Sequence, residues 1–162
     1  MLAATQGVLA AFGAAPAEAG RKIVSISDKY ELGSIVVVNS QRKLYYVIGK
    51  GRALLYPVAV GTKDSQWTGQ SFVHSKAVNP SWTPPWAPSR VVRGGPGNPL
   101  GVRALYLGWT QYRIHGTNAP GSIGSAASHG CFRMFNEDVK DLYDRVHIGA
   151  PVFVLNTMED ES

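Results

Sequence analysis

Short apolar runs, each closed by turn residues, fill the first half of the chain, and no helical period competes with them. The runs are rich in Val, Ile, Leu and Tyr, and tripeptides containing Asn or Gly separate them. This pattern is typical of strands joined by tight turns. The sequence therefore predicts a β-meander after a short lead-in strand at 23–27. Its strands are expected at 34–39, 43–48 and 53–60.

The second half is predicted to hold further strands and one clear helix. The helix should follow Asn136, which we expect to be its N-cap because Asn side chains accept hydrogen bonds from the first free N–H groups. Apolar residues at helical spacing come next, and Gly149 should end the helix. Further strands are expected at 71–78, 104–107, 111–114 and 151–155.

Residues 79–88 contain four prolines, a density that excludes both a helix and a central strand. We expect an extended, stiff loop there, which the Gly- and Pro-rich residues 94–101 continue. Long ordered loops in compact domains are often functional. The loop carries Trp82 and Trp86. The sequence leaves open whether these indoles cover an edge of the core or line a substrate groove.

Length and charge narrow the function classes. A chain of 162 residues suits one domain with a sizeable core. No apolar run is long enough to span a bilayer, so no transmembrane segment is predicted. The net charge is +5, but the basic residues are scattered and form no run. We therefore expect no nucleic-acid partner.

The only cysteine is Cys131, within Ser128-His129-Gly130-Cys131-Phe132-Arg133-Met134. It cannot form an internal disulfide, and a free thiol in an exported protein is a liability unless it performs chemistry. The alternative is a buried core cysteine, which the polar neighbours His129 and Gly130 disfavour. Only a thiolate attacks, and a nearby imidazole can take the thiol proton or stay as a cation beside the thiolate.

His115 is the preferred base for this thiol. His129 would share a face with Cys131 if the stretch between them is extended, but catalytic bases usually come from a separate element. The backbone N–H groups of His129, Gly130 and Cys131 could form an oxyanion hole. Arg133 is suited to gripping a substrate carboxylate, and the alternative for it is a structural ion pair.

A zinc site is the competing chemical interpretation. His115, His129 and Cys131 are zinc-type ligands, and His74 could be a fourth. The Cys-x-x-Cys and His-x₃-His spacings of structural zinc sites are absent from the sequence. We therefore expect no metal, and we expect His74 and His147 to be non-catalytic.

Taken together, these motifs resemble a known family. His115-Gly116-Thr117, followed by the Ser-His-Gly-Cys motif with a hydrophobic residue and Arg after it, is similar to the signature of L,D-transpeptidase catalytic domains, also called YkuD domains. Segments 79–85, 95–101 and 104–107 resemble the ErfK/YbiS branch of Gram-negative bacteria. The resemblance departs at 66–72, where the family's Thr-Pro-x-Gly-x-Phe segment lacks its proline, which affects the expected shape of that loop.

The resemblance implies a mainly β fold, a YkuD-like β-sandwich of mixed sheets with one short α-helix after the active-site motif. It implies Cys131 as nucleophile, His115 as proton donor and acceptor, and the Gly116 carbonyl as the group that orients His115. It implies the backbone of 129–131 as oxyanion hole, and no cofactor. The residues we expect to bind substrate are Arg133, Ser128, Trp82, Trp86 and Asn118.

The resemblance also implies an activity. Family members cleave a peptidoglycan stem tetrapeptide between meso-diaminopimelate and the terminal D-Ala, through a thioester. They pass the acyl group to another diaminopimelate, giving a 3→3 cross-link, or to the lysine of a lipoprotein of the outer membrane. Carbapenems acylate the same cysteine. Two alternatives remain: an L,D-carboxypeptidase, with water as acceptor, and a non-catalytic peptidoglycan-binding module.

Composition at the two ends and the family resemblance in between divide the chain into four expected parts. Residues 1–20 are Ala-rich, contain no Lys or Arg, and carry Ala17-Glu18-Ala19, which looks like a signal-peptidase site. We interpret them as an export-signal remnant or a linker, which favours a periplasmic location. A lead-in segment is expected at 21–33, the L,D-transpeptidase catalytic domain at 34–156, and a solvated acidic tail at 157–162.

Overall fold

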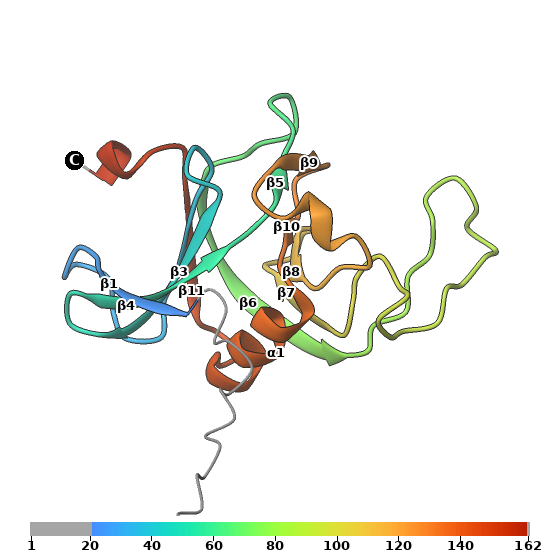
Figure 1. Ribbon diagram of the computed structural model, residues 1–162, viewed down its shortest axis with the longest axis horizontal. Coiled ribbons are helices and arrows are strands. Elements are labelled where there is room, and N and C mark those ends of the chain that lie inside the picture. The colour runs from blue at the N-terminus through green and yellow to red at the C-terminus, as the bar shows by residue number, and fades with distance from the viewer. Residues whose placement is uncertain (1–20, 162) are drawn as a thin grey trace, which may run out of the picture.

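Within residues 21–161, the part of the chain that the computed structural model describes, nine strands form one sheet in the order β1-β4-β3-β2-β11-β6-β7-β8-β10 (Figure 1). The predictions for residues 1–20 lie outside these residues. The strands are β1 (Lys22–Ser25), β2 (Ile35–Val38), β3 (Lys43–Gly49), β4 (Arg52–Pro57), β5 (Val60–Gly61), β6 (Gly69–Val78), β7 (Arg103–Leu107), β8 (Arg113–His115), β9 (Ala126–Ser128), β10 (Phe132–Arg133) and β11 (Pro151–Leu155). The helices are α1 (Asn136–Arg145) and two 3₁₀ turns, η1 (Pro120–Ser122) and η2 (Met158–Glu161).

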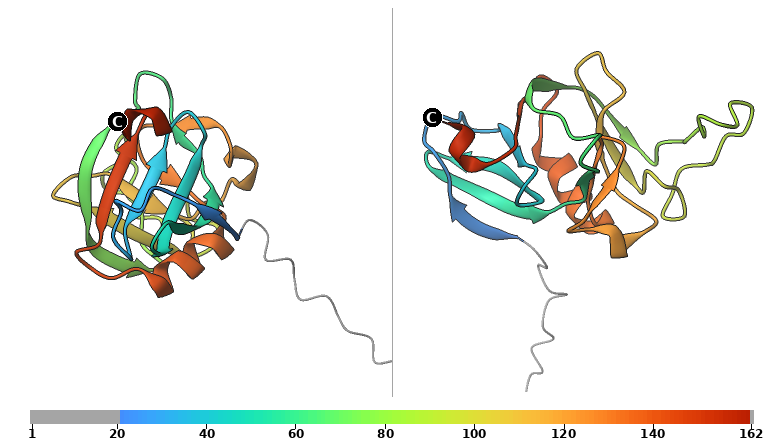
Figure 2. Two further views of the ribbon diagram at one scale, coloured as in Figure 1. Left: turned by 90° about the vertical axis from the view of Figure 1, so that its left-hand side faces the viewer. Right: turned by 90° about the horizontal axis from the view of Figure 1, so that it is seen from above.

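The long strand β6 joins two halves of the sheet. Its first residues pair with β11, and from Val73 onward it pairs with β7. The register shifts between Val73 and Ser75, and a bulge of this kind bends a strand and increases its twist. The two halves can therefore pack against each other, and Figure 2 shows them from two further sides.

Parallel and antiparallel pairs are mixed. The pairs β2–β11, β8–β10 and β5–β9 are parallel, and the other pairs of neighbouring strands are antiparallel. Together with the single α-helix after the cysteine motif, this arrangement confirms the predicted mainly β fold with mixed sheets.

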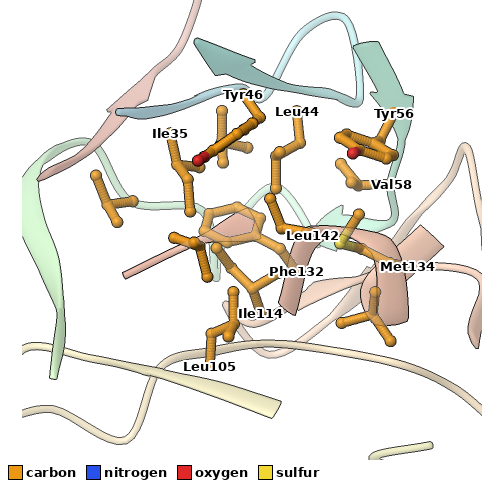
Figure 3. Packing of buried hydrophobic residues seen from close by; sticks show 14 of the residues in the cluster. Ile35, Leu44, Tyr46, Tyr56, Val58, Leu105, Ile114, Phe132, Met134 and Leu142 are labelled. Atoms are coloured by element: carbon orange, nitrogen blue, oxygen red, sulfur yellow. The ribbon is translucent and has the colours of Figure 1, made fainter. Parts of the chain in front are cut away.

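The main core lies between the two halves of the sheet and α1 (Figure 3). Side chains alternate along a strand, so every second residue of β3 can enter this core, as Leu44 and Tyr46 do. Their neighbours Tyr45 and Val47 enter a second cluster on the other face, which Ile26 of the lead-in segment helps to cover. The labelled members of the main core are Ile35, Leu44, Tyr46, Tyr56, Val58, Leu105, Ile114, Phe132, Met134 and Leu142.

The helix prediction was wrong at both ends. Phe135 is the N-cap, and Asn136 is the first helical residue and makes no capping hydrogen bond. The Asn136 amide instead binds the backbone of Thr117, so a tertiary contact has displaced the local one. The helix ends at Arg145, well before Gly149. The strand predicted at 53–60 is also divided, because β4 ends at Pro57 and β5 begins at Val60.

The Pro-rich loop between β6 and β7 projects from the body of the molecule, as predicted for an irregular segment (Figure 1). One isolated bridge pairs Trp82 with Val92 through two backbone hydrogen bonds of 3.0 and 2.8 Å. Asn98 is buried at its base, where its Nδ2 donates to the carbonyl oxygens of Val92 and Arg93. The loop is thus fastened at its base while its tip extends outward.

The segment predicted to be a solvated tail forms η2, and Met158 packs against the second cluster. Within residues 21–161, no helix is both long and apolar enough to cross a membrane.

Leu44→Ala should lower the free energy of unfolding by about 2–5 kcal/mol, because Leu44 is fully buried in the main core and the smaller side chain leaves a cavity. Leu32→Ala is the matched control. Leu32 is 72% exposed, so its change should stay within about 0.5 kcal/mol. Denaturant unfolding measures both values, and equal losses would contradict this description of the core.

Candidate active site

The parallel pairing of β8 with β10 brings the strand that ends at His115 next to the strand that follows Cys131. Ile114 pairs with Phe132, and both side chains are buried in the main core. His115 pairs with Arg133, so these two side chains leave the strands on the opposite face. Cys131 directly precedes β10, and alternation places it on the same face as Arg133. Sequence positions 115 and 131 therefore share one face of the sheet.

This face forms the floor of a cleft of about 830 Å³. Both His115 and Cys131 line it. The five residues predicted to bind substrate line it as well, from β9, β10, the Pro-rich loop and the segment after β8. His129 joins them, while His74 and His147 do not. A second cavity, of about 730 Å³ beside β11, is lined by no cysteine or histidine.

Sequence reasoning missed Tyr112 and Arg113, which also line the cleft. Arg113 is two residues before His115 in the same strand, so alternation places both on one face. The sequence therefore held a signal for Arg113, whereas Tyr112 lies outside the strand and gave none.

His115 is buried, and its ring is held by its own chain. Nδ1 lies 2.5 Å from the carbonyl oxygen of Gly116. A carbonyl oxygen only accepts hydrogen bonds, so Nδ1 carries the proton and Nε2 of the neutral ring is left as the acceptor. Burial above all, together with the positive charges of Arg133 and Arg113, lowers the pKa of His115 from 6.5 to about 4, although the hydrogen bond to the Gly116 carbonyl opposes this shift. The ring is therefore neutral at neutral pH.

The segment after His115 is fixed by Asn136. Its Oδ1 accepts from the Thr117 N–H at 3.0 Å, and its Nδ2 donates to the Thr117 carbonyl at 3.1 Å. Gly101 packs against this contact with φ +63°, and a Cβ there would lie 2.2 Å from Asn136 Oδ1 and 2.4 Å from Thr117 N. Only glycine fits, so the loop before β7 and the start of α1 together hold the carbonyl that orients His115.

The thiol of Cys131 is half-buried. Its Sγ contacts the carbonyl oxygen of Gln111 at 3.8 Å, a long and weak contact. Among the hydrogen bonds of residues 21–161, none joins Cys131 directly to His115, although both line the cleft.

Ser128 shapes the turn that leads to Cys131. Its Oγ donates to the Cys131 carbonyl at 2.5 Å and accepts from the Gly130 N–H at 3.1 Å. The hydroxyl predicted to bind substrate is thus already engaged twice. The Gly130 N–H is engaged as well, which leaves the N–H groups of His129 and Cys131 as the candidates for an oxyanion hole.

Arg133 has no carboxylate partner among the described residues. Its guanidinium makes two long contacts, at 3.4 Å, with Ser122 Oγ and the Ala127 carbonyl. The structural ion pair considered as an alternative is therefore not found. Arg113 is also without a carboxylate partner in this part of the chain, and its guanidinium lies 5.6 Å from the ring centre of Tyr106.

The two indoles of the Pro-rich loop contact each other. Trp82 is half-buried and Trp86 is 79% exposed, with ring centres 5.6 Å apart in an edge-to-face arrangement. Both line the cleft, so the loop contributes to the groove and not only to the cover of the core. Asn118, in the segment after β8, is bonded to the continuation of this loop, because its Nδ2 donates to the Gly97 carbonyl at 3.2 Å.

The zinc alternative finds no support in the arrangement of the side chains. Within residues 21–161, no three His, Cys, Asp or Glu side chains are grouped so that they could hold a metal ion. His74 is occupied elsewhere, with its ring 4.2 Å from that of Trp109 and its Nδ1 3.2 Å from Ser75 Oγ.

Comparison with known proteins gives one consistent family. A family model described as the L,D-transpeptidase catalytic domain (YkuD) matches residues 33–154. The chain is 39% identical over 132 residues to "Probable L,D-transpeptidase YbiS" of Escherichia coli K12, covering 72% of this chain and 43% of that protein. It is 32% identical over 144 residues to "Probable L,D-transpeptidase ErfK/SrfK" of the same strain, covering 81% and 46%. The chain thus spans less than half the length of these two relatives.

Solved structures agree on the fold. L,D-transpeptidase 3 from Mycobacterium tuberculosis, in complex with a faropenem-derived adduct, matches with a TM-score of 0.62 at 21% identity, over 75% of this chain and 59% of that one. The catalytic domain of the Enterococcus faecium L,D-transpeptidase matches with a TM-score of 0.60 at 21% identity, over 76% and 96%.

Through His115, the free energy of unfolding should rise with pH between about 4 and 6.5. In the unfolded chain the ring titrates near 6.5 and in the folded protein near 4, so in this window the unfolded state binds a proton that the folded state does not. Asp138 opposes the effect, because burial raises the pKa of its carboxyl to about 6.

The comparison of the wild type with His115→Gln isolates the histidine, since Asp138 is common to both. Denaturant unfolding measured from about pH 4 to pH 7 should show a rise in stability that is smaller in the variant. Parallel pH profiles would mean that His115 is not buried in its neutral form.

Proposed function

The chain belongs to the YkuD family of L,D-transpeptidase catalytic domains, and on that basis we propose that it is a peptidoglycan L,D-transpeptidase, a cysteine acyltransferase with Cys131 as nucleophile. One observation carries the proposal. A neutral imidazole, oriented by the Gly116 carbonyl, faces the same cleft as the chain's only thiol. We assign the catalytic domain to residues 34–156.

In the first step the Cys131 sulfur attacks the carbonyl carbon that joins diaminopimelate to the terminal D-Ala. Nε2 of His115 takes the thiol proton, and the carbonyl oxygen becomes an oxyanion that the backbone N–H groups of His129 and Cys131 stabilise. The C–N bond then breaks, His115 returns the proton to the leaving amine, and D-Ala departs. The donor stays on Cys131 as a thioester.

In the second step an acceptor amine attacks the thioester. His115 takes a proton from the amine, the C–S bond breaks as the new amide forms, and His115 gives the proton to the departing sulfur, which restores the thiol and the neutral ring. The hydrogen bond between His115 and Cys131 is expected to form when the donor binds, because catalytic hydrogen bonds that are long in an unliganded site commonly tighten in the complex.

The cleft is suited to an anionic donor. Arg113 and Arg133 both line it, and no Asp or Glu among the described residues does. Arg133 pairs with His115 across β8 and β10, and Arg113 lies two residues before His115 in β8, so alternation places both arginines on the face that carries His115. A tetrapeptide donor carries carboxylates on diaminopimelate and on D-Ala, and guanidinium groups bind carboxylates in a bidentate manner. Trp82 and Trp86 supply an aromatic wall for the rest of the stem.

The proposed partners follow from this chemistry. The donor is a peptidoglycan stem peptide, and the acceptor is the side-chain amine of another diaminopimelate or the lysine of an outer-membrane lipoprotein. Such substrates place the enzyme in the periplasm, with residues 1–20 as an export-signal remnant or a linker. A carbapenem would acylate Cys131 in place of the donor.

Incubation with a donor tetrapeptide, followed by intact mass, should show an acyl adduct on the wild-type protein and release of D-Ala. Cys131→Ala should release none. His115→Gln should slow release by about 100-fold or more, because general-base catalysis contributes about 10²–10⁴-fold. His147→Gln is the matched control: His147 is exposed and lies outside the cleft, so release should be unchanged.

The products separate the competing functions. Release of D-Ala by Cys131→Ala would refute the nucleophile assignment. Release by the wild type without a cross-linked product, in the presence of an amine acceptor, would identify an L,D-carboxypeptidase. Binding to peptidoglycan with no adduct at all would identify a binding module.

Arg133→Gln and Arg113→Gln should each raise KM for the tetrapeptide by about 10- to 100-fold, because a hydrogen bond to a charged group contributes about 1.5–3 kcal/mol. Arg52→Gln is the control, since Arg52 is exposed on β4 and lies outside the cleft. A donor whose diaminopimelate carboxylate is amidated should bind the wild type more weakly. Unchanged KM in both variants would show that the donor's carboxylates lie elsewhere.

A further inference from the structure

We propose that Trp67 is a positioning residue that aims the Cys131 N–H at the oxyanion of the tetrahedral intermediate. The inference deepens the proposed function and rests on it. Trp67 lies in the segment between β5 and β6, outside the cysteine motif and outside the residues that line the cleft. It acts through a peptide bond and does not touch the substrate.

The indole of Trp67 binds the chain directly before the nucleophile. Its Nε1–H donates to the Gly130 carbonyl oxygen at 2.9 Å. The indole itself is fixed, because it stacks on the Tyr112 ring at 4.8 Å with an angle of 11° between the planes, and it lies 5.7 Å from the Phe132 ring. The backbone of Trp67 is fixed as well, since the buried Asn39 donates to its carbonyl at 3.0 Å.

This hydrogen bond sets the direction of one particular N–H group. The Gly130 carbonyl and the Cys131 N–H belong to the same peptide unit, which is planar and trans. In such a unit the C=O and N–H bonds point in opposite directions. With the oxygen held toward Trp67, the Cys131 N–H points away from it.

Like the His129 N–H, that N–H remains available as a donor in the turn. Ser128 already engages the Gly130 N–H and the Cys131 carbonyl. Within residues 21–161, the Cys131 N–H donates to no protein acceptor. A donor fixed before the reaction begins is what stabilises an oxyanion most effectively, because it needs no reorganisation.

Gly130 permits this arrangement because it has no side chain and can adopt a positive φ. Its φ is +122°, a region that favours glycine. A Cβ there would lie 2.5 Å from the Tyr112 ring and 3.2 Å from the Ser65 carbonyl oxygen. The Tyr112 ring, which stacks on Trp67, therefore lies against Gly130, while the indole binds the Gly130 carbonyl oxygen.

Trp67→Phe tests the role of the N–H, because phenylalanine keeps an aromatic ring against Tyr112 and loses the donor. With the donor tetrapeptide, kcat should fall by about 10- to 100-fold and KM should stay within about twofold, since a misplaced oxyanion donor affects the transition state and not donor binding. Trp109→Phe is the matched control, because Trp109 is 83% exposed and lies outside the cleft.

Alkylation of Cys131 by iodoacetamide supplies the second readout. This reaction needs the sulfur nucleophile but forms no oxyanion, so its rate should be unchanged in Trp67→Phe. A positioning role therefore predicts slow acylation with normal alkylation. Parallel losses in both reactions would show general disorder of the site and would overturn the inference, as would acylation at the wild-type rate.

A third variant covers the case in which Trp67→Phe does not fold. Site-specific replacement of Trp67 by 3-benzothienylalanine keeps the size of the indole and substitutes sulfur for its N–H, so it should reproduce the selective loss of acylation. A wild-type protein that alkylates but releases no D-Ala would overturn the proposed function, and this inference with it. An active wild type with an equally active Trp67→Phe would overturn this inference alone.

Discussion

The arrangement of the site depends on the pairing of β8 with β10. Ile114 and Phe132 face each other across this pair and are buried in the main core. Their burial fixes the register, because a slip of β10 by one residue would turn Phe132 toward solvent and Arg133 into the core. The same register sends His115 and Arg133 to the other face. Alternation places Cys131 on that face as well. The hydrophobic core thus determines which face of the sheet carries His115 and Cys131, although no core residue is proposed to react.

Side chains that hold backbone groups supply the remaining precision. Asn136 holds Thr117, Ser128 holds the turn before Cys131, and Trp67 holds the Gly130 carbonyl. Each of the three comes from a different element, and none is a nucleophile or a base. Loops of this kind lack the ladder hydrogen bonds of a strand, so their backbone groups are satisfied by side chains instead. The site is therefore built on strands and its adjustable parts are fixed by α1, β9 and the segment before β6.

The sequence predicted what local rules decide and missed what tertiary contacts decide. The strands and the irregular Pro-rich loop follow from alternation, turn residues and proline density. The expectation that His115 and Cys131 share one site came from the chemistry of a thiol and a base on separate elements and from the family signature, and both residues line one cleft. Asn136 was predicted to be an N-cap because Asn is favoured at that position, yet its side-chain amide binds the backbone of Thr117, 19 positions away. Trp67 could not be recognised, because its partner Gly130 is 63 positions away and no spacing rule links the two.

The electrostatics of the cleft also choose between two ways of activating the thiol, which the sequence left open. Burial and the two guanidinium groups disfavour a cationic His115 and hold its pKa near 4. A resting thiolate–imidazolium pair would require that disfavoured cation. In the proposed mechanism the neutral ring instead takes the proton as the sulfur attacks, so that charge develops on the donor's oxyanion. Under the proposed function Arg113 and Arg133 would serve two purposes, since the same positive charges that lower the pKa of His115 would attract an anionic donor to it.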